Sequence, residues 1–457
     1  MALLTSPDVV VVGAGFAGLS AAVRLTTRGM RVLVVEGRPR LGGRATAFAD
    51  AATGETVDNG QHVLMGCYTA TLAFLQDIGA IGHVRRQPTL SVTMIDRAGK
   101  RSRLACPPLP APWHLLAGVI EWEALDWADR LSLLRMATPL KLARDPKRLA
   151  ASPGETVETW LIRHGQTERL REMLWRPLAL AALNQPADRA GAAPFARVLA
   201  EMFTGDTAAA SIVLPTQPLD AMYAEPARTF IEARGGEVRT GATATIRLSG
   251  VNVTDVEAGG QHWLPRAVIA AVPWFAIHSL FDGRLDAIAD IVERAGHMSS
   301  SPIATVNLWF DRPVLDEPFV GLPGRVMQWV FDKRTVFGDS ASHLSLVSSG
   351  ADAIVGLPND QLIALAHAEL LESLPPVRSA RLLRSTVVRE RQATFSLAPG
   401  QPARPATETP VRGLFLAGDW IDTGLPATIE SAVRAGHRAA DAVSREVGHV
   451  VAAASGR

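Results

Sequence analysis

Apolar positions near the N-terminus follow two different periodicities within a short stretch. Continuous β-branched or aliphatic runs at residues 9–12 and 32–35 predict two buried strands. Between them, residues 19–28 have helical spacing, and Gly29 follows as a helix-ending residue. This order predicts a βαβ unit at the start of the chain.

The remaining pattern predicts an interleaved α/β architecture. Residues 83–204 have mostly helical spacing, clearest at 127–142 and 155–183, whereas apolar runs at 303–310, 326–331 and 343–347 predict strands. A helix is expected at 361–374, a buried strand at 266–273, and a final strand and helix at 414–417 and 426–440. We predict a discontinuous nucleotide-binding domain (7–82, 214–275, 391–448) and a substrate-binding domain (83–213, 276–390), the latter of α+β type.

Composition agrees with a large enzyme and excludes several other classes. A chain of 457 residues is longer than one hydrophobic core usually serves, so two domains are expected. The 46 Lys and Arg residues nearly balance 45 Asp and Glu, without a dense basic run, which gives no indication of nucleic-acid binding. Two isolated cysteines, Cys67 and Cys106, predict neither a disulfide framework nor a metal site.

Glycines at the end of the first strand predict a dinucleotide site. Gly13 permits a tight turn, Gly15 lets the backbone approach a pyrophosphate, and Gly18 lets helix and strand approach closely. Glu36 lies at the end of the second strand, where an acid binds the ribose hydroxyls of an adenosine. The intervening residues of the motif, expected at the same ligand, are Ala14, Phe16 and Ala17.

The continuation after the second strand favours FAD over NAD. Gly37 and Arg38 are followed by Gly42, Gly43 and Arg44, whose backbone N–H groups and guanidinium suit the pyrophosphate of an extended dinucleotide. This segment resembles the FAD-binding amine-oxidase and phytoene-desaturase superfamily. The resemblance implies a Rossmann-like FAD-binding domain of amine-oxidase and glutathione-reductase type.

The same resemblance assigns cofactor contacts far along the chain. It implies that the backbone of Val238 lies against the adenine and that Asp419, after Gly418, accepts a ribityl hydroxyl. The next helix would direct its N-terminal N–H groups at the flavin, where a positive helix end stabilises the reduced form. Its first residues are Ala427, Thr428 and Ile429. Because this region has no cysteine, we expect noncovalent FAD.

A more specific resemblance rests on the segment DNGQH, which contains Gly60, Gln61 and His62 and is expected beside the flavin. With LWRPLALAALNQP at 174–186, LPTQPLDAMYAEPARTFIEARGGEVR and GDWIDTGLPATIESAVRAG, the segment is similar to the hydroxysqualene dehydroxylases of bacterial hopanoid biosynthesis. These enzymes are also described as squalene-associated FAD-dependent desaturases. The similarity covers the chain from Val9 to about Val443.

This resemblance implies reductive removal of an allylic hydroxyl from a long-chain isoprenoid. The protein must supply a proton to the leaving hydroxyl, and His62 is the first candidate, with an orienting role as its alternative. Tyr68 and Asn184 are further candidates for contacting the hydroxyl, and Arg176 is a candidate contact or a structural ion-pair partner. Trp160, Trp175, Trp274 and Trp309 are interpreted as either a hydrocarbon tunnel or ordinary core.

Two other functions remain open. The same fold could desaturate or oxidise a polyprenyl or carotenoid-type chain, or the flavin could support a redox-neutral isomerase or a lipid-handling role. We find no second glycine triplet between a strand and a helix, so an external electron donor or acceptor is expected in place of a built-in NAD(P)H domain.

Membrane contact is expected at a surface. No segment reaches the roughly 18–20 apolar residues of a spanning helix, and the longest uncharged stretch, residues 104–120, begins with four prolines. Its second half, with Trp113, Trp122 and Trp127, suits a membrane interface or a wall of the substrate domain. The N-terminus has no pattern of a secretory signal, which favours a cytoplasmic protein, peripheral on the inner membrane.

Overall fold

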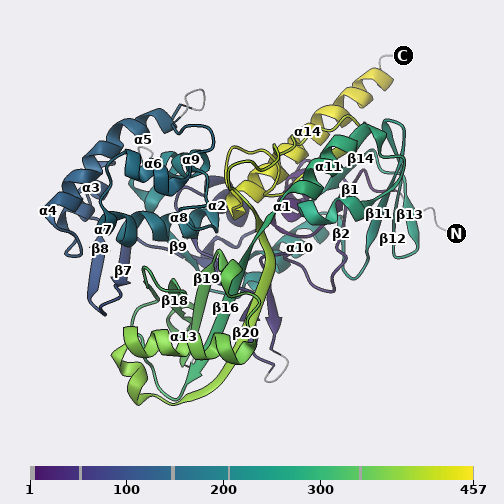
Figure 1. Ribbon diagram of the computed structural model, residues 1–457. Helices are drawn as coiled ribbons and strands as arrows, with labels where there is room; N and C mark the ends of the chain where they lie inside the picture. The colour runs from purple at the N-terminus through teal and green to yellow at the C-terminus, as the bar shows by residue number, and fades with distance from the viewer. Residues whose placement is uncertain (1–5, 51–53, 146–149, 204–205, 339–341, 456–457) are drawn as a thin grey trace.

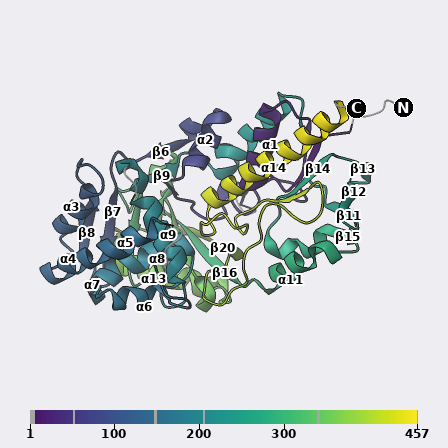
Figure 2. The same ribbon diagram turned by 90° about the horizontal axis from the view of Figure 1, so that it is seen from above.

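The computed structural model describes residues 6–50, 54–145, 150–203, 206–338 and 342–455. Helices of residues 113–202 gather at one end of the molecule, and the N-terminal and C-terminal elements gather at the other (Figure 1). The view from above shows the same elongated arrangement, with α14 lying along α1 (Figure 2).

A five-stranded sheet, in which every neighbouring pair is parallel, lies at the end of the molecule that contains both chain termini. Its strand order is β10-β2-β1-β14-β21, so segments from the start, middle and end of the chain lie side by side. Its strands are β1 (Val9–Val12), β2 (Val32–Val35), β10 (Glu237–Arg239), β14 (Ala267–Ala270) and β21 (Leu414–Leu416). The strands are short, and all except the edge strand β10 are wholly apolar and buried because both faces of a parallel sheet are covered.

Helices cover one face of this sheet, and a second sheet covers the other. The helices are α1 (Phe16–Thr27), α2 (Thr69–Asp77), α10 (Glu225–Glu232) and α14 (Ile429–Ser455). Gly436 of α14 lies so close to α1 that a Cβ there would be 2.2 Å from the Ala17 carbonyl oxygen. On the other face lie β11 (Ala244–Ser249), β12 (Asn252–Ala258), β13 (Gln261–Trp263), β15 (Phe281–Gly283) and α11 (Ala289–His297).

The βαβ unit forms as predicted, but its helix begins three residues earlier. Gly15 is the N-cap, with extended backbone, and α1 starts at Phe16, so Gly18 lies inside the first turn. A Cβ at Gly18 would be 1.8 Å from the Gly13 carbonyl oxygen. The glycine is therefore required by the approach of helix to turn, as its position in the motif implies.

A seven-stranded, mainly antiparallel sheet forms the other large element, in the order β20-β16-β19-β18-β17-β7-β8. Its strands are β7 (Ser91–Ile95), β8 (Arg101–Ala105), β16 (Ser300–Phe310), β17 (Phe319–Gly321), β18 (Trp329–Asp332), β19 (Ser342–Ser349) and β20 (Leu382–Phe395). Helices α12 (Lys333–Phe337) and α13 (Asn359–Ser373) follow β18 and β19. The predicted domain boundary at residue 390 falls inside β20, and the two-domain division stays a prediction.

Helices fill the segment between β8 and β9 (Ile212–Pro215), where they were predicted. They are α3 (Trp113–Glu121), α4 (Trp127–Leu133), α5 (Ala137–Ala143), α6 (Val157–Arg163), α7 (Glu168–Leu170), α8 (Arg176–Leu183) and α9 (Ala192–Met202). The helical spacing at 155–183 corresponds to three helices, α6, α7 and α8, because the chain breaks at Gly165, whose φ is +64°. Past this break, a π-helical turn at Arg171–Trp175 joins α7 to α8.

Two further expectations need correction. The expected helical character of residues 83–112 was wrong, because β6 (Val84–Arg86), β7 and β8 lie there. The strand expected at 326–331 begins only at Trp329, since the backbone N–H groups of Val326 and Met327 donate to the Glu369 carboxylate. The remaining strands are β3 (Ala47–Ala49), β4 (Thr56–Asp58) and β5 (Leu64–Met65).

Candidate active site

One cavity of about 640 Å³ connects the carboxyl ends of the parallel strands with the seven-stranded sheet. Ligands of open α/β sheets bind at this edge. The cavity is lined by most of the residues expected from the sequence: Gly13, Gly15, Phe16, Ala17, Glu36, Gly37, Arg38, Gly42, Gly43, Arg44, Gly60, Gln61, His62, Tyr68, Asn184, Gly418, Asp419, Ala427, Thr428 and Ile429.

Glycines shape the half of the cavity nearest the parallel sheet. Gly13 has a φ of +105°, and a Cβ there would be 2.5 Å from the Ala271 carbonyl oxygen. Gly43 lies against Gly15 at the cavity wall, and a Cβ on Gly43 would be 3.4 Å from the Gly15 Cα. Two backbone segments that approach this closely, beside the N-terminus of α1, form a cradle that fits a pyrophosphate.

Glu36 organises the turn as well as facing the cavity. Its carboxylate accepts hydrogen bonds from the backbone N–H groups of Ala14, at 2.8 Å, and Arg38, at 2.9 Å. Ala14 therefore contributes through Glu36, although it does not line the cavity itself. The carboxylate remains at the cavity wall, in the position that suits a ribose hydroxyl.

Arg44 and Asp419 join the two FAD motifs of the sequence. Arg44 Nη2 donates to Asp419 Oδ1 at 2.5 Å, and Arg44 Nη1 donates to the Ala393 carbonyl oxygen at 2.9 Å. The guanidinium also lies over the ring of Trp274, 5.2 Å from its centroid. Both ionic groups line the cavity, so they are positioned to hold the pyrophosphate and ribityl portions of one ligand.

The adenine contact predicted at Val238 is not found at the cavity wall. Val238 pairs with Val34 inside the parallel sheet, and the cavity is lined instead by Thr243 and Ala244. The segment after β10 thus reaches the cavity, while β10 itself forms the edge of the sheet. The glycine pair before β10 predicted the strand but not which of its neighbours reaches the cavity.

Tyr223 is a site residue that the sequence pattern did not reveal. Its hydroxyl donates to the carbonyl oxygens of Gly42 and Ala45, at 2.9 and 3.0 Å, and its ring stacks on Phe16 with centroids 3.6 Å apart. It therefore fixes the Gly-Gly-Arg loop against α1.

A buried ion pair between Lys333 and Asp58 fixes the DNGQH segment on the side away from the cavity. Lys333 Nζ lies 3.2 Å from Asp58 Oδ2 and donates to Gln61 Oε1 at 2.5 Å, and both charged side chains are 2% exposed. Breaking a buried pair leaves an uncompensated charge, so each partner fixes the other. Sequence reasoning missed Lys333, which lies 275 residues from Asp58 and has no motif around it.

His62 lies at the cavity wall as expected, in a neutral form. Burial lowers its pKa to about 4, because the charged imidazolium loses hydration and Lys333 lies nearby, although Asp58 acts in the opposite direction. At neutral pH only about one molecule in a thousand carries the proton. This favours the orienting role of His62 over that of proton donor.

Tyr68 and Asn184 also line the cavity, but they differ in whether a hydrogen-bond donor is free to contact a substrate. Burial raises the pKa of Tyr68 well above its ordinary value, which makes its hydroxyl a weak acid. Asn184 Nδ2 donates to the Ser301 carbonyl oxygen and Thr394 Oγ1, both at 3.0 Å, and Oδ1 accepts from Gly350 N at 2.8 Å. Asn184 therefore joins three segments and has no free amide hydrogen for a substrate.

The far half of the cavity is apolar. One wall comes from α8 and the π-helical turn before it, and the opposite wall comes from the seven-stranded sheet. The lining residues of this half include Leu90, Val92, Met94, Leu104, Leu174, Pro177, Leu178, Ala181, Ala182, Ile303, Phe319, Trp329, Phe331 and Val347. Trp160, Trp175, Trp274 and Trp309 are buried core, outside the lining, while Trp329 is the tryptophan at the cavity.

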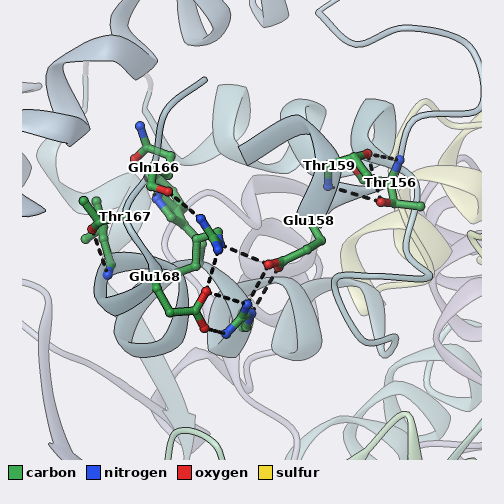
Figure 3. Close-up of polar contacts among 10 residues, drawn as sticks. Thr156, Glu158, Thr159, Gln166, Thr167 and Glu168 are labelled. Atoms are coloured by element: carbon green, nitrogen blue, oxygen red, sulfur yellow. Dashed lines mark hydrogen bonds and ion pairs between the residues drawn. The ribbon is translucent and has the colours of Figure 1, made fainter. Parts of the chain in front are cut away.

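Arg176 is a structural ion-pair partner. Its guanidinium contacts Glu158 and Glu168, with Nη2 to Glu158 Oε1 at 2.6 Å and Nη1 to Glu168 Oε1 at 2.5 Å. Figure 3 shows both carboxylates directed at the same group of guanidinium nitrogens. Arg171 shares these carboxylates, so the network clamps α6 to the helix that forms the cavity wall.

The part of the chain that the structure describes contains no cluster of His, Cys, Asp or Glu suited to a metal ion. Within the same residues, no helix is long and apolar enough to cross a membrane.

Comparison with known proteins relates this geometry to a family. Residues 16–444 match the model of the flavin containing amine oxidoreductases. The chain is 32% identical over 451 residues to a hydroxysqualene dehydroxylase of Rhodopseudomonas palustris, covering 96% of this chain and 98% of the relative. It is 25% identical to a probable zeta-carotene desaturase of Synechococcus elongatus, with 95% and 98% covered.

A solved structure supports the same fold. Cyclohexylamine oxidase from Brevibacterium oxydans superimposes with a TM-score of 0.72 at 17% identity, covering 97% of this chain and 100% of that one. The resemblance inferred from the sequence is confirmed, as are the fold class and FAD as cofactor. The chain belongs to the flavin containing amine oxidoreductase family, among the relatives of the hydroxysqualene dehydroxylases.

Proposed function

We propose that this enzyme reductively removes the allylic hydroxyl of hydroxysqualene to give squalene. The observation that carries the proposal is the continuity of the glycine-lined cofactor cradle with an apolar half in one cavity. A long hydrocarbon fits such a wall, and the identity to a hydroxysqualene dehydroxylase favours this substrate over other isoprenoids. The reaction would place the enzyme in squalene and hopanoid synthesis.

The chain's own residues supply binding, orientation and exclusion of water. Reduced FAD, when bound, supplies the hydride. Backbone groups of the glycine cradle, Glu36 and the Arg44–Asp419 pair would hold the dinucleotide, and the Lys333–Asp58 pair keeps the DNGQH segment in place. The apolar walls would hold the allylic carbon and exclude bulk water, which would otherwise trap a carbocation.

We also propose that the substrate arrives from a membrane surface. Large apolar side chains are exposed around α3 and α4, most of all Trp113 and Trp127, which are 61% and 66% exposed. Leu109, Ile120, Leu131 and Leu134 extend this surface, called here the α3–α4 apolar surface. Leu104 of the preceding strand lines the cavity, and α3 lies on that strand, with Gly118 against Cys106.

Such a surface suits binding at the boundary of lipid headgroups and acyl chains, with indole rings at the headgroup level. Peripheral attachment at the inner membrane and reduction of the flavin by an external two-electron donor complete the proposal. The expectation for residues 104–127 is corrected at Trp122, which is buried.

Desaturation of a polyprenyl or carotenoid-type chain is the second candidate, favoured by the similarity to a zeta-carotene desaturase. Product mass separates the candidates. Incubation of reduced enzyme with hydroxysqualene should give a product that has lost one oxygen atom. A substrate that lost two hydrogens with the oxidised enzyme would favour desaturation, and an unchanged mass with a moved double bond would favour isomerisation.

A further inference from the structure

Glu390 places a carboxyl group at the cavity, outside the set of residues that form the cofactor cradle. It lies on β20 and contributes to the lining of the same cavity as the cofactor residues. Its strand also carries Ala393 and Thr394, which line the cavity three and four residues later. The Ala393 carbonyl oxygen accepts from Arg44, so this end of β20 is attached to the cofactor half.

Strand register fixes the direction of the Glu390 side chain. Ile303 of β16 pairs with Glu390 on one side and with Ser349 of β19 on the other. Directly opposed residues of neighbouring strands project from the same face of a sheet. All three residues line the cavity, so Glu390 points from the sheet into it.

The surroundings of Glu390 on that face are almost entirely apolar. Across the neighbouring strands the same cavity wall consists of Phe319, Trp329, Phe331 and Val347, with Ser349 as a small polar neighbour. Ligand cavities with apolar walls carry a small number of polar groups that orient the ligand, and Glu390 is placed as such a group.

Glu390 is also the uncommitted acid of the cavity. The other two lining carboxylates are Glu36, which holds two backbone N–H groups, and Asp419, which is paired with Arg44. Glu390 has no hydrogen-bond or ion-pair partner among the residues described in the structure. It is therefore free to contact a ligand.

The alternative proton donors are less suited to the task. His62 is neutral at physiological pH, and Asn184 has both amide hydrogens engaged. The Tyr68 hydroxyl is a much weaker acid than a carboxylic acid, and burial weakens it further. An oxygen that leaves as water needs an acid that can give up its proton readily.

We propose that Glu390 is the catalytic acid that protonates the hydroxyl group of the substrate. This inference rests on the proposed dehydroxylation. The O–H bond of the carboxylic acid breaks, its proton goes to the substrate oxygen, and the C–O bond breaks with its electron pair leaving in water. The allylic carbon takes up the hydride from reduced FAD, so R–OH, H⁺ and H⁻ become R–H and H2O. Solvent reprotonates the carboxylate between turnovers.

The test compares wild type with E390Q in anaerobic single turnover of photoreduced enzyme with hydroxysqualene. E390Q keeps the shape and polarity of the side chain but has no acidic proton, so the rate of squalene formation should fall about 10²- to 10⁴-fold. Binding of hydroxysqualene, followed by the spectral change of the oxidised flavin, should stay within about threefold of wild type because the cavity is preserved. E408Q is the matched control, since Glu408 is exposed, does not line the cavity and pairs with Arg445.

The pH profile separates proton donation from a structural effect. A catalytic acid makes the rate fall as pH rises, so the wild-type profile should show such a limb, which should be missing in E390Q and displaced in E390D. If E390Q fails to retain FAD, the displacement in E390D decides the matter. An E390Q rate within threefold of wild type, or an unmoved pH limb in E390D, would overturn the role of Glu390, and a matching loss in Y68F would transfer it to Tyr68. Wild-type enzyme that forms no squalene would reject the proposed function itself.

Discussion

Arg44 and Asp419 form an ion pair at 2.5 Å across 375 residues of sequence, and both side chains face the cofactor cavity. The pair closes the cradle by connecting the loop after β2 to the loop after β21. Arg44 additionally binds the Ala393 carbonyl oxygen, so the same guanidinium positions the strand that carries Glu390. The Arg44 side chain thus connects three segments: the loop after β2, the loop after β21 and the end of β20.

Loss of this ion pair should weaken FAD binding. For R44Q and D419N we expect the Kd for FAD to rise about tenfold to hundredfold, because a hydrogen bond to a charged group contributes ~1.5–3 kcal/mol. Fluorescence of free FAD released on dilution measures the change. R163Q, which removes an ion pair on α6 far from the cradle, should bind FAD normally. Equal loss in that control would show a general effect on folding.

Gly18 should tolerate no side chain. G18A should lower the free energy of unfolding by about 1–3 kcal/mol or more and abolish FAD retention, because its Cβ would lie 1.8 Å from the Gly13 carbonyl oxygen. G82A is the matched variant, since nothing lies within 4 Å of a Cβ there and Gly82 has no positive φ. Thermal unfolding and flavin absorbance after purification check both. A yellow, fully stable G18A would contradict the close approach of α1 to the turn.

Histidines should make the folded protein less stable in mild acid. Burial lowers the pKa of His62 to about 4, and that of His437 to about 4, below the ordinary value near 6.5. Above pH 6.5 both states are neutral. Between pH 6.5 and about 4 the unfolded chain takes up protons that the native protein does not, so stability falls by about 1.4 kcal/mol per pH unit for each histidine.

The midpoint of thermal unfolding should therefore fall from pH 7 to pH 5, and less steeply in H62Q. NMR titration of protein with labelled histidines reports the site directly, and the signal that H62Q removes should titrate near pH 4. A value at or above 6.5 would contradict the buried, neutral His62 and would reopen its role as proton donor.

The α3–α4 apolar surface should bind lipid. The double variant W113S/W127S should lose most of its co-sedimentation with vesicles of phosphatidylethanolamine and phosphatidylglycerol, because two exposed indoles leave the interface. L264S is the control, since Leu264 is 71% exposed but lies on the turn after β13, in the other part of the molecule. Unchanged binding of the double variant, or an equal loss in L264S, would place membrane contact elsewhere.

Local patterns in the sequence predicted the elements that local interactions determine. The apolar runs around Gly13 and Leu414 predicted β1, β2 and β21, and the spacing at 361–374 predicted α13. The same reasoning failed at β7 and β8, although SVTMI and RSRLA alternate as strands do, because the helical pattern around them dominated a window of that length. Their place beside β17 depends on contacts more than 200 residues away.

The residues of the candidate site also fall into those that a local sequence pattern predicts and those that only tertiary contacts place. Residues within glycine motifs could be predicted, since a turn that binds a pyrophosphate constrains its own sequence. Lys333, Tyr223 and Glu390 could not, because each meets its partners only through tertiary packing or strand register. A single glutamate in the alternating polar stretch RERQAT carries no signal of its own until β16 is placed beside it.

The most direct test of the central claim is one anaerobic turnover. The purified enzyme is photoreduced, hydroxysqualene is added without any other reductant, and flavin absorbance and product mass are followed together. We expect reoxidation of one flavin for each squalene formed. A flavin that stays reduced while the substrate remains intact would contradict reductive dehydroxylation.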